Sequence, residues 1–197
     1  MQPFLGSRFQ IAPGFFLFGA ICLFILPVQW FFGFLIASFA HEICHYICLK
    51  LLGIPVYSVT IGMSGAKIYT GAMQPFQELL SALSGPLGVL PLILLIHQFP
   101  YVALCAIFQT LFNLLPILPL DGGRAMLCLS VMLFGWVRGA HLVQILQYIF
   151  GILLVAGLMW IVLYLKLGLF HVLTVVFLGF RLSTVKFPCK AGNQIVQ

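Results

Sequence analysis

Long apolar segments separated by short polar interruptions make up most of the chain. A helix needs about 20 predominantly apolar residues to cross the hydrocarbon core of a bilayer. By that criterion the pattern predicts five or six spans, over residues 14–29, 31–50, 76–97, 101–118, 141–165 and 168–180. We therefore expect an all-α polytopic membrane protein with about six transmembrane helices.

Composition supports this fold class. The 197 residues are 63% hydrophobic and only 6% charged, whereas charged residues make up about a quarter of a typical soluble domain. No small-residue cleavage site follows the first apolar segment, so we interpret it as a retained span and not as a signal peptide. The six cysteines show no CxxC spacing, which argues against a disulfide framework or a thiolate zinc site.

The net charge of +6 comes from basic residues that lie mostly at the ends of the predicted spans. Such a distribution orients helices and meets anionic lipid headgroups, so we expect contact with a lipid bilayer and none with nucleic acid. Taking the Arg8 end as cytoplasmic places all but one of the basic residues at span ends on the cytoplasmic side. This predicts a multi-pass protein with both termini in the cytoplasm, and a bacterial cell membrane is the expected location.

Residues 54–73 form the only sizeable segment that does not fit a helix. They are rich in β-branched residues, and Gly62, Gly65 and Gly71 divide them into two short runs, which favours a small membrane-associated β-hairpin. Unpaired backbone groups cannot face lipid, so the hairpin must lie at the interface or line a protein cavity. It is either a surface turn between helices or an edge that pairs with an extended peptide.

The chain contains only three acidic residues, Glu42, Glu78 and Asp121. Glu78 lies near the start of a predicted span, where a carboxylate is favourable at a helix N-terminus. Glu42 and Asp121 lie in or beside membrane segments, where an ionisable side chain costs at least about 2.5–3.5 kcal/mol and indicates function. Two of the three acids therefore require a chemical explanation.

The segment HEICH provides the explanation for Glu42. His41 and His45 are one turn apart on one face of a predicted helix and can share a metal ion. Glu42 is rotated by about 100° from His41, which suits a general base that is not itself a ligand. The alternative is a pair of histidines that bond to backbone groups or to each other inside a helix bundle.

A catalytic zinc site usually has three protein ligands and one open position. Asp121 is the best candidate for the third ligand, because prolines and glycines in NLLPILPLDGG would interrupt the helix there and broken backbone at membrane depth lines cavities. His97, His141 and His171 lie near predicted span ends and are better explained as interfacial or capping residues. Asn113 either forms an interhelical hydrogen bond or contacts substrate backbone.

Three motifs of the chain together resemble those of a known family. HEICH in a membrane helix, SGPLG at residues 84–88 and NLLPILPLDGG about 75 residues after the first motif are similar to the motifs of the site-2 protease (M50) family of intramembrane zinc metalloproteases. The pattern is most similar to the subgroup of the stage IV sporulation protein FB, although the short tail has no room for that subgroup's CBS domain. The resemblance covers roughly residues 31–127.

The resemblance implies a zinc ion held by His41, His45 and Asp121, with Glu42 as the catalytic acid and base. It also implies cleavage of a membrane-tethered protein, for example a sigma-factor precursor or anchor, with regulatory membrane partners. We expect Asn113, Pro116, Gly62 and Gly65 to contact the substrate. The expected organisation is one protease domain over residues 1–181, with its core at 31–127 and a short tail at 182–197.

Two other classes of function use similar residues. A metal or proton transporter could employ the same histidines and carboxylates, but transporters usually contain internal repeats and polar residues at several depths, which this chain lacks. A catalytically inactive membrane-binding module is the second alternative, and the intact Glu42 argues against it. The expected activity is thus zinc-dependent intramembrane endopeptidase, a hydrolase whose oligomeric state the sequence leaves open.

Overall fold

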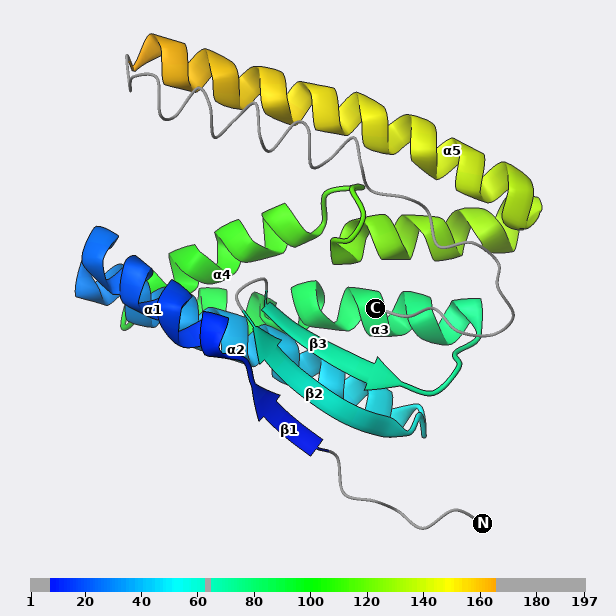
Figure 1. Ribbon diagram of the computed structural model, residues 1–197, viewed down its shortest axis with the longest axis horizontal. Coiled ribbons are helices and arrows are strands. Elements are labelled where there is room, and N and C mark those ends of the chain that lie inside the picture. The colour runs from blue at the N-terminus through cyan, green and yellow to red at the C-terminus, as the bar shows by residue number, and fades with distance from the viewer. Residues whose placement is uncertain (1–7, 63–64, 166–197) are drawn as a thin grey trace.

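The computed structural model describes residues 8–62 and 65–165 (Figure 1). In this part of the chain a small sheet lies beside a group of helices, and the longest helix covers the group on one side. The elements follow in the order β1 (Arg8–Ile11), α1 (Pro13–Ile25), α2 (Val28–Leu51), β2 (Val56–Gly62), β3 (Gly65–Thr70), α3 (Pro75–Gly88), the 3-10 helix η1 (Leu90–Leu95), α4 (Pro100–Asn113) and α5 (Asp121–Tyr164).

The sheet contains the predicted hairpin and one further strand. Strands β2 and β3 pair antiparallel, with Val59 opposite Ile68, which confirms the hairpin. Strand β1 pairs in parallel with the other side of β2, with Phe9 opposite Val59. This strand was not predicted, because a parallel partner separated by a helical crossover leaves no local turn signal in the sequence.

Helix α3 and the 3-10 helix η1 together occupy the third predicted span, and their starts have local causes. Pro75 occupies the first turn of α3, where its missing N–H is not needed. Gln74 and Gln77 form a reciprocal capping box at the same end. Pro86 lies inside α3, and the helix continues as η1 after Val89.

Helix α4 is shorter than the predicted span 101–118, which was wrong at its C-terminal end. The helix ends at Asn113, and residues 114–120 form a loop that contains a cis peptide bond between Leu118 and Pro119. A proline disfavours helical backbone at the preceding residue and removes a hydrogen-bond donor. Pro116 and Pro119 therefore account for the loop that precedes Asp121.

Helix α5 begins at Asp121, well before the predicted span 141–165. Gly135 interrupts it with φ 77° and ψ 168°, a conformation that favours glycine, and the chain reverses direction there (Figure 1). Gly139 then packs against the backbone of the first segment, where an added Cβ would lie 2.6 Å from the carbonyl carbon of Ser130. The first segment of this helix was not predicted, because its polar residues and glycines interrupt the apolar run.

Within the described residues, three helices are long and apolar enough to cross a membrane: Val28–Leu51, Pro75–Leu95 and Asp121–Tyr164. The apolar helices α1 and α4 have only 13 and 14 residues. The prediction of six spans is thus not confirmed. The predicted span 168–180 and the tail 182–197 lie outside the described residues.

We predict that Gly139→Ala destabilises the protein, because the added methyl group would overlap the backbone of Ser130. Overpacking of this kind costs about 1–3 kcal/mol, which thermal unfolding in detergent would register as a lower midpoint. Gly157→Ala in the same helix is the matched control, since nothing lies within 4 Å of its added Cβ. Equal shifts for the two variants would contradict this description of the α5 turn.

Candidate metal centre

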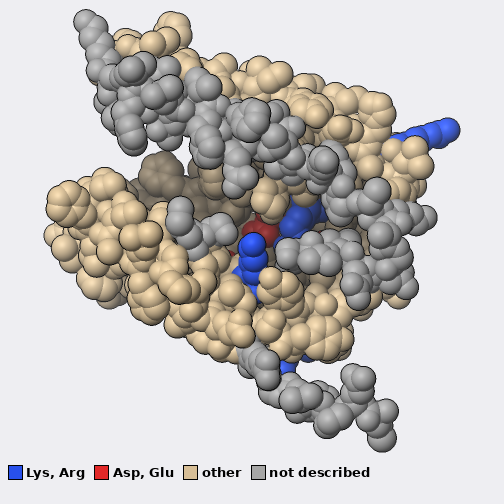
Figure 2. All heavy atoms as spheres, viewed as in Figure 1, with Lys and Arg blue, Asp and Glu red and all other residues tan. Residues whose placement is uncertain are grey.

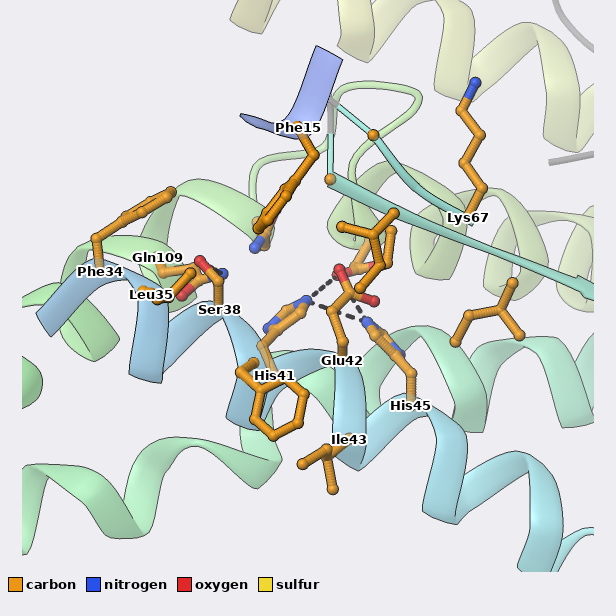
Figure 3. Close-up of a pocket in the computed structure, with 18 of the residues that line it drawn as sticks. Phe15, Phe34, Leu35, Ser38, His41, Glu42, Ile43, His45, Lys67 and Gln109 are labelled. Carbon is orange, nitrogen blue, oxygen red and sulfur yellow. Dashed lines mark hydrogen bonds and ion pairs between the residues drawn. The ribbon is translucent and has the colours of Figure 1, made fainter. Parts of the chain in front are cut away.

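Helix α2 presents both histidines of the HEICH segment on its buried face. Its buried residues recur every four positions, the spacing of one helical face. His41 and His45 are 3% and 7% exposed, and their side chains point the same way from the helix (Figure 3). The buried stripe consists of Gly33, Ala37, His41, His45 and Leu49.

Asp121 meets the two histidines from the first turn of α5. Its Oδ2 atom lies 3.0 Å from Nε2 of His41 and 3.2 Å from Nε2 of His45. The two Nε2 atoms are 3.1 Å apart. Three potential ligand atoms from two helices therefore converge on one point.

Helix α3 orients one of these histidines. Nδ1 of His45 donates a hydrogen bond of 2.7 Å to the carbonyl oxygen of Ser81. A carbonyl oxygen only accepts, so Nδ1 carries the proton, and Nε2 of the neutral ring is left with a lone pair that a metal ion could share with Asp121. Backbone acceptors hold metal-bound histidines in the same way.

The donor set fits a divalent metal ion such as zinc. Zinc lies about 2.0–2.2 Å from nitrogen and oxygen ligands, so tetrahedral ligand atoms are about 3.4 Å apart. The observed separations of 3.0, 3.1 and 3.2 Å are within a few tenths of an ångström of that value. His41, His45 and Asp121 form the one group of this kind in the described part of the chain.

Glu42 lies next to this group without belonging to it. It projects from α2 between the two histidines (Figure 3), and its carboxylate interacts with the backbone of Ala66 in β3. The hairpin therefore lies beside Glu42. The arrangement suits a carboxylate that exchanges a proton with a group held at the three ligands.

Close packing of α3 against α2 depends on Gly85, the glycine of the SGPLG segment. An added Cβ would lie 2.6 Å from Cε1 of His45 and 2.8 Å from Cε1 of His41. Gly122 and Gly123 likewise allow the start of α5 to pack closely against the loop of residues 114–120. A Cβ at Gly123 would lie 2.5 Å from the carbonyl carbon of Ile117. These glycines allow three helices to approach one point.

The centre opens into a cavity of about 1770 Å³. Figure 2 shows acidic atoms within a hollow of the surface, with basic side chains beside them. Gly62, Gly65 and Asn113 line the cavity, whereas Pro116 is not among its lining residues. The Asn113 side chain forms no hydrogen bond within the described residues, so the interhelical bond considered as an alternative is not observed.

Other predicted residues lie apart from this centre. His97 and His141 are exposed and contribute no ligand, and His171 is outside the described residues. The five cysteines in the described segments are free thiols.

Two contributors to the centre were not predicted from the sequence, the Ser81 carbonyl and Arg124. Every residue carries a carbonyl group, so no sequence pattern could have identified the one at Ser81. The Arg124 guanidinium lies between Glu78 and Asp121, 3.5 Å from an oxygen of each. Its position three residues after Asp121 was a signal, because residues at this spacing are neighbours on a helix.

Comparisons with known proteins are consistent with this geometry. Residues 66–157 match the family model described as Peptidase family M50. That segment includes Asp121 but not the HEICH residues, so the match and the motif are separate observations.

A solved structure, the "Site-2 Protease from Methanocaldococcus jannaschii", has a similar fold with a TM-score of 0.61. The two sequences are 18% identical over 95% of this chain and 96% of that chain. No match was found among the curated proteins.

We predict that Gly85→Ala abolishes stoichiometric metal binding, because the methyl group would overlap atoms of both imidazole rings. Metal content per chain, measured on protein purified in detergent, checks this. Gly157→Ala is the control for the same change in a helix with open space around it. A Gly85→Ala protein with one tightly held metal ion would contradict the described packing.

Proposed function

We propose that this protein is a zinc-dependent intramembrane endopeptidase of the site-2 protease type. The observation that carries the proposal is the convergence of His41, His45 and Asp121 beside Glu42. A zinc hydrolase needs three ligands, here two imidazoles and a carboxylate, and a second carboxylate nearby that is not a ligand. The match of residues 66–157, a segment that includes Asp121 but not the two histidines, to Peptidase family M50 supports the same conclusion.

In this proposal His41, His45 and Asp121 hold the zinc ion. When bound, zinc lowers the pKa of a water molecule to about 7 and polarises a carbonyl group. His45 is held in the productive tautomer by the Ser81 carbonyl. Asp121 contributes a negative charge that partly offsets the charge of the metal in apolar surroundings.

Glu42 moves the proton. It accepts a proton from the attacking water while the water oxygen bonds to the carbonyl carbon of the scissile peptide. It then delivers that proton to the amide nitrogen as the carbon–nitrogen bond breaks. The products are a carboxylate and an amine, so one water molecule is consumed for each bond cleaved.

The substrate is proposed to bind as an extended segment along the hairpin. Amide groups in an intact membrane helix are engaged in hydrogen bonds to the residue four positions earlier, so a spanning helix must unwind before attack. Strand β3 is at the edge of the sheet, and its Ala66 contacts Glu42. An extended peptide added to this edge would run past the catalytic residues.

The proposed substrate class is a membrane-tethered protein, such as a sigma-factor precursor or its anchor. Gly62 and Gly65 at the tip of the hairpin and Asn113 at the end of α4 line the cavity and are proposed to contact it. Pro116 is proposed to act indirectly, by shaping the loop before Asp121. A bilayer location with several spans and both termini in the cytoplasm completes the proposal.

We predict that Glu42→Gln lowers cleavage by at least about 100-fold, the lower end of what general acid–base catalysis contributes, and leaves zinc bound. The readout is the set of membrane-protein fragments found by mass spectrometry in cells expressing each variant. His41→Ala is the matched variant that should lose both zinc and cleavage. Continued cleavage by a zinc-loaded Glu42→Gln protein would overturn the mechanism.

For Asn113→Ala we predict weaker substrate binding with unchanged zinc content. Loss of one hydrogen bond costs about 0.5–1.5 kcal/mol, so KM should rise by about 2- to 10-fold with little change in kcat. Kinetics on a peptide taken from an identified cleavage site would measure this. Gln98→Ala, an exposed amide just before α4, is the control, and an unchanged KM in Asn113→Ala would remove Asn113 from the substrate site.

A further inference from the structure

A buried chain of charges extends from the metal centre to the start of α3. Nη1 of Arg124 lies 3.5 Å from Oδ1 of Asp121, and Nη2 lies 3.5 Å from Oε1 of Glu78. The side chains of Arg124, Glu78 and Asp121 are only 17%, 4% and 12% exposed. Two of the chain's three acidic residues thus share one guanidinium group.

The two oxygens of Asp121 have different partners. Oδ2 faces the Nε2 atoms of His41 and His45, whereas Oδ1 faces Arg124. A carboxylate without a partner on its second oxygen can rotate and offer either oxygen, or both, to a metal ion. The ion pair on Oδ1 restricts this rotation and leaves Oδ2 directed at the histidines.

From this arrangement we infer that Arg124 is a positioning residue that makes Asp121 a one-oxygen ligand, and that Glu78 anchors Arg124 for this purpose. The inference rests on the proposed function, because it concerns the metal that His41, His45 and Asp121 would hold. Glu78 thereby has a second role, anchoring Arg124, in addition to the stabilisation of a helix N-terminus that its place in the sequence predicts.

Helix α3 is the element that makes this positioning possible. It supplies the Ser81 carbonyl that orients His45 and, three residues earlier, Glu78 that pairs with Arg124. One helix that contributes no ligand therefore orients ligands from α2 and from α5. The contacts use two nitrogens held apart in one rigid plane, which arginine offers, whereas the donors of lysine all lie on a single nitrogen.

A merely structural role is the competing explanation, in which the Glu78–Arg124 ion pair only holds α3 against α5. The two explanations differ in what they predict for metal affinity. If the pair is only structural, its loss would lower the stability of the metal-free protein but leave the affinity of a correctly folded centre unchanged. Loss of a positioning residue would weaken the centre in protein that remains folded.

The test is zinc affinity of the full chain in detergent, measured by competition with a chromophoric chelator. Changes around metal ligands typically reduce affinity by about 10- to 100-fold, and we expect a loss in this range for Arg124→Ala. Arg124→Lys should show a loss as well, because its single nitrogen cannot replace two guanidinium nitrogens that each face a different carboxylate. The visible spectrum of the Co²⁺-loaded protein should change in both variants. Arg138→Ala, an exposed arginine on the same helix, should match the unsubstituted protein.

A double-mutant cycle tests the part assigned to Glu78. Glu78→Gln should weaken zinc binding, and Glu78→Gln combined with Arg124→Ala should bind zinc no more weakly than Arg124→Ala alone, because Glu78 acts through Arg124. Additive losses in the cycle would overturn the anchoring role.

The remaining outcomes separate this inference from the proposed function. If the unsubstituted protein binds zinc tightly and folded Arg124→Ala and Arg124→Lys bind it equally well with the same Co²⁺ spectrum, the positioning role is wrong and the proposed function stands. If the unsubstituted protein binds no zinc, the proposed function fails and this inference with it. Should Arg124→Ala not fold, the Arg124→Lys affinity decides the question.

Discussion

The close approach of two imidazoles on α2 to a carboxylate on α5 is the contact on which the rest of the structure depends. Three polar atoms 3.0–3.2 Å apart lie among helices that are mainly apolar. Groups of this kind are costly to bury unless each has a partner. A shared cation would satisfy all three atoms at once, as the proposed function requires.

This approach requires backbone segments to pack more closely than most side chains allow. Gly85 brings α3 against the histidines, and Gly122 and Gly123 bring the start of α5 under the preceding loop. Any Cβ at these positions would overlap a ring or a carbonyl group. The glycines of the SGPLG and DGG segments therefore have a packing explanation that is independent of any comparison with other proteins.

The proposed peptide hydrolysis would also require space for water and for an unwound substrate. The cavity beside Glu42 is large enough for this use, and the hairpin forms part of its wall. Ala66 of strand β3 and Glu42 line the same cavity, while β2 is paired on its other side with β1. Strand β1 thus supports the hairpin from the side of β2, and the β3 edge of the sheet remains beside the centre.

The sequence by itself determined the features that depend on neighbouring residues. The spacing of His41, Glu42 and His45 indicated their relative directions on one helix, glycine positions predicted the hairpin, and prolines predicted the break before Asp121. Each of these follows from backbone geometry over a few residues.

Only the tertiary structure decided the features that join distant segments. These are the position of Asp121 against the histidines, the Ser81 carbonyl behind His45, the Arg124 link to Glu78, the parallel strand β1 and the reversal at Gly135. The sequence suggested Asp121 as the best candidate and through the resemblance of its motif, but nothing local specifies which helices meet. Such contacts are selected by the packing of whole helices, in which a backbone carbonyl or a missing Cβ matters as much as any side chain.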